Sequence, residues 1–178
     1  VIGGSGSSKW FHKVKDVLHR AVYEWNPPSD LKARINHLRQ RKENELSQES
    51  EHLRNIKEGR GGLLDVEYLT QALQLKHGQL CPELQNPKTM EALQELEKNS
   101  FIKKHELKVL YKNYIFLRLI ENGLRLIYDD STNLLDFKSV RQATILHLLN
   151  HQGYSVNNLR DEVESATSEI RGIYLNYF

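Results

Sequence analysis

The sequence has little cysteine, proline or glycine. Cys81 is the only cysteine in 178 residues, so no disulfide can form within the chain, and this is typical of a protein from the reducing cytoplasm. Four prolines and ten glycines, most of the glycines outside the periodic stretches, leave room for long uninterrupted helices. No run of 18 apolar residues occurs, so we expect no membrane-spanning helix.

An excess of charge of one sign is also lacking, since 25 basic and 23 acidic residues give a formal net charge of +2. A nucleic-acid-binding domain usually carries a concentrated basic excess. The one basic run, residues 32–42, is followed at once by an acidic run at 43–51. We interpret the pair as a solvated helix whose charges pair along its length, and we expect no nucleic-acid partner. Salt-sensitive binding to DNA or RNA would be needed to revive that possibility.

What the sequence does have is helical periodicity nearly throughout, without a convincing alternating strand pattern. Short connections between amphipathic helices favour antiparallel neighbours, so we predict an all-α fold, an antiparallel helical bundle of about six to seven helices. Residues 1–9 are expected to be a flexible lead-in or appended residues, and residues 10–178 a single helical domain. The expected helices span residues 10–25, 29 or 30 to 57, 63–77, 87–99, 104–128, 137–152 and 156–178.

The most distinctive segment, KEGRGGLLDVEYLTQ, runs from Lys57 to Gln71. Its glycines permit a tight turn, and the helix that follows offers free N–H groups and a partial positive charge at its start. Such a corner could hold a phosphate or a carboxylate, or it could simply be a bend between two helices. No strand and no Gly-Lys-Ser/Thr sequence accompany it, so it is not a P-loop. The candidate cleft-facing or anion-binding residues are Lys57, Gly59, Arg60, Gly61, Gly62, Asp65 and Glu67.

The two acids of this segment have separate expected roles. Asp65 and Glu67 lie about 200° apart around a helix, so they cannot share one metal ion. Asp65 falls in the first turn, where an acid stabilises the helix dipole, and Glu67 borders the apolar face.

Three further charges fall on or beside the apolar stripe of residues 104–128, namely Arg118, Glu121 and Arg125. A charge on a buried face needs a partner. We therefore hypothesise that Arg118, or Arg60, pairs with Glu67 or Asp65 across a helix interface. The alternative is that these long side chains reach solvent at the rim.

The chain offers little for metal chemistry or catalysis. His147 and His151 have a zinc-ligand spacing, but HLLNH lacks the glutamate of HExxH and no third ligand is evident, so we expect no metal site. Nucleotidyl transfer needs paired carboxylates that hold Mg²⁺ around a triphosphate. No Asp-x-Asp pair follows the Gly/Ser-rich residues 3–8, so we expect no catalytic residue in this chain.

The order of motifs resembles a known family. The corner GRGGLLDVEYLTQ is followed by QLKHG, a P-x-L turn, TMEAL and FLRLIENGLR. In this order, over roughly residues 10–178, the motifs resemble the helical domains of glutamine synthetase adenylyltransferases. The version here looks more like the C-terminal helical domain that follows the second, adenylylating nucleotidyltransferase half, and IRGIYLNYF resembles the family's closing pattern. Gly123 departs from the family, which usually has arginine at this position.

The resemblance implies a function for the full enzyme, which transfers AMP from ATP, with Mg²⁺, to a tyrosine of glutamine synthetase. Its other half removes the AMP, and glutamine and the PII signalling protein regulate it. This chain would then be an inactive accessory domain that binds no cofactor alone and faces the cleft of the upstream catalytic domain through the Gly59–Glu67 corner. The alternative is a protein-interaction module that docks PII or glutamine synthetase through its second or last helix, without a part in the active site.

Overall fold

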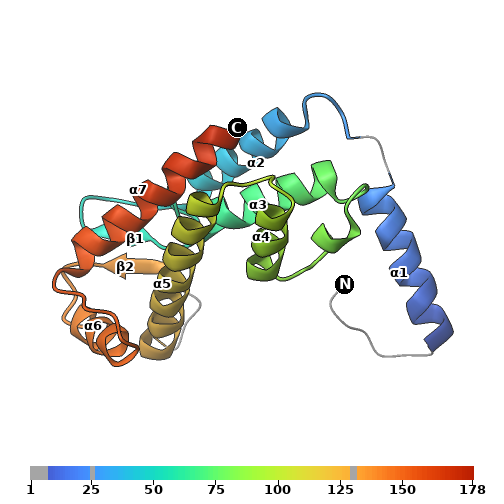
Figure 1. Cartoon of the computed structure of the whole chain (residues 1–178). Coiled ribbons are helices and arrows are strands. Elements are labelled where there is room, and N and C mark those ends of the chain that lie inside the picture. The colour runs from blue at the N-terminus through green and yellow to red at the C-terminus, as the bar shows by residue number, and fades with distance from the viewer. Residues whose placement is uncertain (1–7, 25–26, 129–131) are drawn as a thin grey trace.

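The computed structural model describes residues 8–24, 27–128 and 132–178, and within them the fold is mostly helical, as predicted (Figure 1). Seven α-helices, one short 3₁₀ helix and two short strands occur in these residues. The elements are α1 (Ser8–Tyr23), α2 (Leu31–Leu46), β1 (Leu53–Asn55), α3 (Leu63–His77), η1 (Pro82–Leu84), α4 (Thr89–Lys98), α5 (Lys104–Tyr128), β2 (Leu134–Asp136), α6 (Gln142–His151) and α7 (Leu159–Tyr177).

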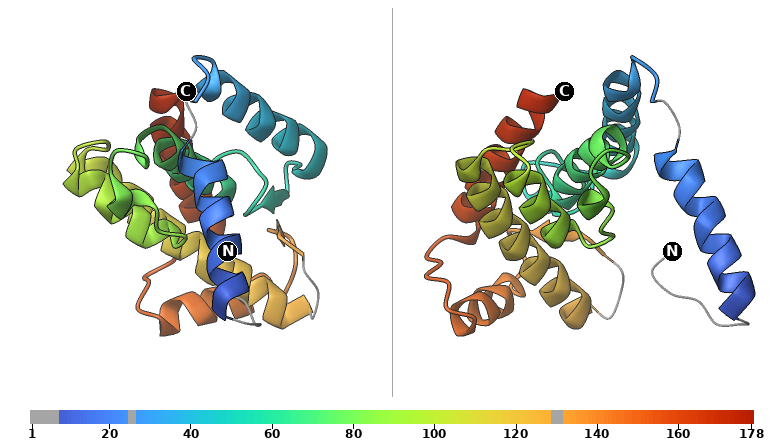
Figure 2. Two further views of the ribbon diagram at one scale, coloured as in Figure 1. Left: turned by 90° about the vertical axis from the view of Figure 1, so that its right-hand side faces the viewer. Right: turned by 45° about the vertical axis from the view of Figure 1, so that its right-hand side comes forward.

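Helices α3 and α5 form the centre of the bundle. α3 packs against α2, α4, α5 and α7, whereas α5 also packs against α6 (Figures 1 and 2). Because α3 has neighbours on several sides, its buried residues lie all around the helix and include Asp65 and Thr70. The shared core contains Leu69, Leu117 and Ile170, whose side chains are fully buried.

The all-helical prediction misses one antiparallel strand pair. β1 and β2 pair Leu53 with Asp136 and Asn55 with Leu134. The expected second helix therefore does not continue to residue 57 but ends at Leu46. The side-chain amide of Asn55 donates to the carbonyl oxygen of Leu46 at 3.2 Å, which satisfies one of the free carbonyls at the end of α2.

The expected sixth helix, residues 137–152, is also too long, since α6 spans only Gln142–His151. The backbone N–H of Lys138 donates to the Asp136 carboxylate at 2.8 Å, and that of Arg141 donates to the Ser139 hydroxyl at 3.2 Å. Side chains that satisfy nearby backbone groups in this way compete with helix formation. The remaining helices agree with the prediction to within about three residues, and α3 and α5 agree at both ends.

Helix α1 stands beside the rest of the molecule rather than within it (Figures 1 and 2). Among its polar contacts with the bundle, the ring of His19 lies 2.8 Å from the side-chain oxygen of Gln85. Trp10, Val14 and Val17 remain 68%, 50% and 57% exposed. Residues 1–7 of the expected lead-in at 1–9 lie outside the described residues, whereas Ser8 and Lys9 already belong to α1. The expected end of the first helix at Trp25 and residues 129–131 also lie outside the described residues.

Candidate functional site

The corner between β1 and α3 is organised by Asn55. Its side-chain oxygen accepts hydrogen bonds from the backbone N–H groups of Lys57 and Glu58, at 3.1 and 2.8 Å. Its carbonyl oxygen accepts from the N–H of Gly59 at 3.1 Å. The chain therefore leaves the strand through a hydrogen-bonded turn and not through the end of a long helix.

The first backbone donors of α3 are already engaged. The N–H groups of Leu63 and Leu64 donate to the carbonyl oxygens of Ile56 and Lys57, at 3.0 and 3.1 Å. The N–H of Asp65 donates to the carbonyl oxygen of Gly62 at 3.0 Å. An anion at a helix start is normally held by such N–H groups. In this corner they stabilise the turn, which favours the structural interpretation of the glycine-rich segment over an anion site made by its backbone.

Asp65 lies at the centre of a buried charge network. Its carboxylate is fully buried and lies 2.6 Å from Nε of Arg39, which is itself fully buried. A nitrogen of Arg171 approaches the same carboxylate at 3.1 Å. The backbone N–H of Gly61 donates to Asp65 at 3.0 Å, and Arg39 donates to the carbonyl oxygen of Gly59 at 2.6 Å. One acid thus joins the corner to α2 and to α7.

Glu43 extends this network toward solvent. Its carboxylate lies 3.2 Å from Arg171 and 3.5 Å from Arg39, and it remains about 20% exposed. Two arginines therefore face two carboxylates, and the four charges balance within the cluster. A buried charge is tolerated only with such partners.

The hypothesis that Arg118 or Arg60 pairs with Asp65 or Glu67 is wrong. Arg118 contacts Glu121 at 2.6 Å on its own helix, and Arg125 contacts the other oxygen of Glu121 at 2.7 Å. Glu121 is fully buried, while both arginines are about two-fifths exposed, so α5 satisfies its buried acid internally. Arg60 is exposed and forms no ion pair with any of the described residues.

Glu67 has a different partner, the hydroxyl of Tyr114 on α5, which donates to its carboxylate at 3.0 Å. Burial, followed by the charge of Glu67, raises the pKa of Tyr114 to about 12. The hydroxyl therefore stays protonated near neutral pH and remains a donor. As expected, Asp65 and Glu67 act separately, although both link α3 to its neighbours.

Gly61 brings the corner into direct contact with α7. Its φ of 73° lies in the left-handed region, and a Cβ placed there would overlap the backbone of Thr167. Only glycine therefore permits both this turn and this close approach. Lys57 is half-buried and Arg60 is exposed, so these two cations form the outward part of the corner.

Sequence reasoning missed Arg39, Glu43 and Arg171. Arg39 and Glu43 lie in the mixed-charge run that we interpret from the sequence as solvated. The helical phase alone could have identified Arg39 as an exception within that run. It falls four residues after Ile35, on the stripe that faces α3. Arg171 was included in the closing pattern but received no role. Its partners are distant in sequence, so its pairing could not be read from spacing.

Gly123 is a packing position. A Cβ added there would lie 2.9 and 3.0 Å from the side chains of Ile145 and Leu148 on α6. An arginine at this position has no room while α6 keeps its place. His147 and His151 are both exposed on α6. Across the described ranges, no group of three histidine, cysteine or acidic side chains lies close enough to hold a metal ion.

None of the described helices combines the length and the apolar character needed to cross a bilayer.

The fold and the corner define a class of protein, a mostly helical domain whose glycine-rich corner is fixed between two helices by a buried Arg–Asp–Arg network. Residues 29–178 match the family model described as GlnD PII-uridylyltransferase, and the chain belongs to this family.

Curated relatives carry the name bifunctional glutamine synthetase adenylyltransferase/adenylyl-removing enzyme. The protein of Alteromonas mediterranea is 30% identical over 118 residues, which are 66% of this chain and 12% of the relative. That of Leifsonia xyli subsp. xyli is 26% identical over 177 residues, 99% of this chain and 18% of the relative. That of Xanthobacter autotrophicus is 37% identical over 81 residues, 46% of this chain and 8% of the relative.

These matches confirm the resemblance to glutamine synthetase adenylyltransferases, of which this chain matches a helical domain. The chain spans less than a fifth of the length of these relatives.

Proposed function

We propose that this chain is the helical accessory domain that follows the second nucleotidyltransferase half of a glutamine synthetase adenylyltransferase. The full-length enzyme would transfer AMP from ATP to a tyrosine of glutamine synthetase, under the control of PII. The order of motifs and the names of the curated relatives support this proposal.

ATP and Mg²⁺ belong, in this proposal, to the upstream catalytic domain. Among the described residues no group of three histidine, cysteine or acidic side chains could hold Mg²⁺, and the N–H groups of Leu63, Leu64 and Asp65 at the start of α3 are engaged within the corner. We therefore assign no step of AMP transfer to a residue of this chain.

The observation that carries the accessory role is the apolar strip on α1, formed by Trp10, Val14 and Val17. These residues fall within about 60° of one another around the helix and are at least half exposed. The family match begins at residue 29, so α1 lies outside it. Contiguous exposed apolar side chains of this kind mark an interaction surface. We assign the strip to contact with the preceding catalytic domain.

The charged residues around the strip indicate the charge that a complementary partner surface should carry. α1 contains four basic residues and one acidic residue. Lys9, Lys13 and Arg20 lie along one edge of the strip. A complementary surface is an apolar groove with carboxylates on the matching side.

The Gly59–Glu67 corner would face the catalytic cleft through Arg60 and Lys57. The buried network beneath it holds the corner in one place, so an exposed Arg60 is presented from a rigid support. The substitution Arg60→Ala is expected to lower adenylylation by the full-length enzyme while leaving its stability within about 0.5 kcal/mol. Unchanged activity would show that the corner does not face the catalytic cleft.

The docking role can be tested with Val14→Asp and Val17→Asp in the full-length enzyme. Each places a carboxylate in the buried contact, so adenylylation of glutamine synthetase should fall by at least about tenfold. Lys108→Asp, at an exposed position of α5, is the matched control and should retain activity. Activity unaffected by both strip substitutions would contradict the proposal, as would adenylylation by the 178-residue chain alone.

An interaction module for PII or glutamine synthetase is the second candidate. Leu38 and Leu46 on α2 are 53% and 48% exposed, and Leu175 on α7 is 49% exposed. Capture of purified PII or glutamine synthetase by the 178-residue chain, lost on Leu38→Asp, would favour this candidate.

The name of the matched family, PII-uridylyltransferase, calls for a third assay, because it refers to uridylyl transfer to PII. The full-length protein should therefore be offered ATP with glutamine synthetase and UTP with PII in parallel. Our proposal predicts transfer in the first pair only.

A further inference from the structure

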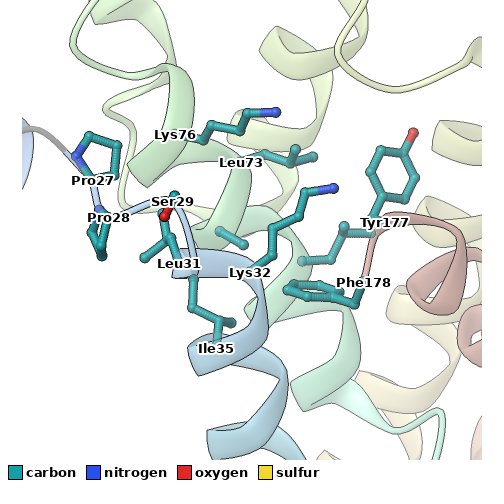
Figure 3. A pocket seen from close by; sticks show the side chains of 12 residues that line it. Pro27, Pro28, Ser29, Leu31, Lys32, Ile35, Leu73, Lys76, Tyr177 and Phe178 are labelled. Carbon is teal, nitrogen blue, oxygen red and sulfur yellow. The ribbon is translucent and has the colours of Figure 1, made fainter.

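An apolar cavity of about 300 Å³ lies between the start of α2, the second half of α3 and the C-terminal residues (Figure 3). This volume is at the lower end of the range of small-molecule sites. Its lining includes Leu69, Ala72 and Leu73, which are at most 7% exposed. Leu31, Ile35 and Phe178 add further apolar surface. The cavity thus continues the core outward and is well suited to a hydrocarbon chain or a ring.

Two amines stand beside this apolar lining. Lys32 from α2 and Lys76 from α3 extend to the same side of the cavity (Figure 3). Both are exposed, and within the described part of the chain neither forms a salt bridge. The Tyr177 hydroxyl donates to Glu106 at 2.6 Å, and Ser29 adds a neutral hydroxyl to the lining. Lys32 and Lys76 are therefore the charged side chains of this lining that remain available to a ligand.

The positive charges of both amines act on the neighbouring side chain of His77. The pKa of His77, next to Lys76, is lowered first by burial and then by the positive charges of Lys76 and Lys32. A cationic ligand would therefore meet repulsion at this cavity, whereas an anionic group would be attracted. The apolar lining in turn disfavours a fully polar anion, which would gain nothing from it.

We propose that this cavity binds a small amphipathic carboxylate. Its apolar part occupies the space between α2, α3 and the C-terminal residues, and its carboxylate lies between the amines of Lys32 and Lys76. The inference does not depend on the proposed accessory function, since it rests on the cavity and its charges alone.

Octanoate and 1-octanol are the appropriate probes, because they share a chain length and differ in charge. Titration of the 178-residue chain, followed by amide chemical shifts, should move the signals of Leu31, Ile35 and Leu73. Octanoate should bind about tenfold more tightly than 1-octanol at low salt, as two partly exposed ion pairs allow. Raising the ionic strength should reduce that difference.

Variants separate the charge from the cavity. The double substitution Lys32→Gln/Lys76→Gln should lower octanoate affinity to that of 1-octanol, while Lys104→Gln/Lys108→Gln, at exposed positions of α5, should leave it unchanged. Ala72→Leu fills the cavity and should weaken both probes. Melting curves of each variant establish that the fold is retained.

Three results would overturn the inference. Equal affinity for octanoate and 1-octanol would show that the cavity has no preference for an anion. Changes in amide chemical shift away from α2 and α3 would show that the probes do not bind in this cavity. Binding to the 178-residue chain but not to the full-length protein would mean that a neighbouring domain fills the cavity.

Discussion

Single buried charges join separate elements of this structure, and Asp65 is the clearest case. It is fully buried, and its carboxylate contacts both Arg39 and Arg171, at 2.6 and 3.1 Å. Removing the acid leaves two guanidinium groups that share Glu43, at 3.2 and 3.5 Å, so one positive charge stays uncompensated in a region of low dielectric constant. The cost of an isolated buried charge is therefore expected to exceed the net contribution of the pair itself.

Asp65→Ala should lower the free energy of unfolding by about 3–5 kcal/mol, because the fully buried Arg39 loses its partner at 2.6 Å and keeps only Glu43 at 3.5 Å. Arg60→Ala, five residues earlier and exposed, should change it by less than about 0.5 kcal/mol. Urea denaturation of both variants provides the measurement. Equal midpoints for the two would show that the Asp65 network adds little to stability.

Glu106 is expected to make stability depend on pH. Burial alone would raise its pKa, but hydrogen bonds from Tyr177 and from the N–H of Lys103 outweigh it, so the pKa lies below the ordinary value of 4.5. A lowered pKa means that the ionised form stabilises the fold, and that this contribution is lost as the pH falls through the lowered pKa.

Glu106→Gln should therefore be less stable than the original chain at pH 7 by about 1–2 kcal/mol, as expected for lost bonds to a charged acceptor. The difference should shrink once the pH falls below about 4.5. Thermal denaturation over this range tests it. A difference that stays constant from pH 7 to pH 3 would contradict the role of the carboxylate.

At the scale of elements, helices with strong internal signals could be predicted and pairings between distant segments could not. α3 and α5 were predicted at both ends, because Gly62 and Gly78 bracket the first and the apolar stripe of the second is long. The strands are three residues each and pair across some eighty residues of chain, so local periodicity carries no trace of them. Arg171 was missed as a partner of Asp65 for the same reason, since 106 positions separate the two residues, whereas the phase of Arg39 on its helix did carry a signal.

The corner and α7 offer a matched pair of glycines. Gly61→Ala should destabilise the fold by at least about 2 kcal/mol, since φ is 73° and a Cβ would meet the backbone of Thr167. Gly172→Ala, within exposed helix and with open space around it, should stabilise by about 0.5–1 kcal/mol. Denaturation midpoints that shift in the same direction would contradict this account of the corner.

The contact between α5 and α6 depends on Gly123. Restoring the family's arginine with Gly123→Arg should cost about 1–3 kcal/mol, because the side chain would displace Ile145 and Leu148. Asn122→Arg, one residue earlier and exposed, should be nearly neutral. Calorimetric melting of the two variants gives the comparison, and a stable Gly123→Arg protein would mean that α6 moves freely.

At the scale of the whole molecule, residues 27–128 and 132–178 form a packed bundle with a continuous core, and α1 lies beside it (Figure 1). The apolar strip of α1 is exposed. The family and the helical fold followed from the order of motifs and from periodicity. The position of α1 did not, because the same apolar stripe is expected for a helix packed in the bundle and for one that binds another domain.

Hydrogen exchange of the α1 amides tests the central claim most directly. It should be measured in the 178-residue chain and in the full-length protein, with α5 as an internal reference. If α1 packs on the preceding catalytic domain, residues 10–22 should exchange at least about tenfold more slowly in the full-length protein, while α5 stays unchanged. Equal exchange of α1 in the two proteins would contradict the docking of this domain through its first helix.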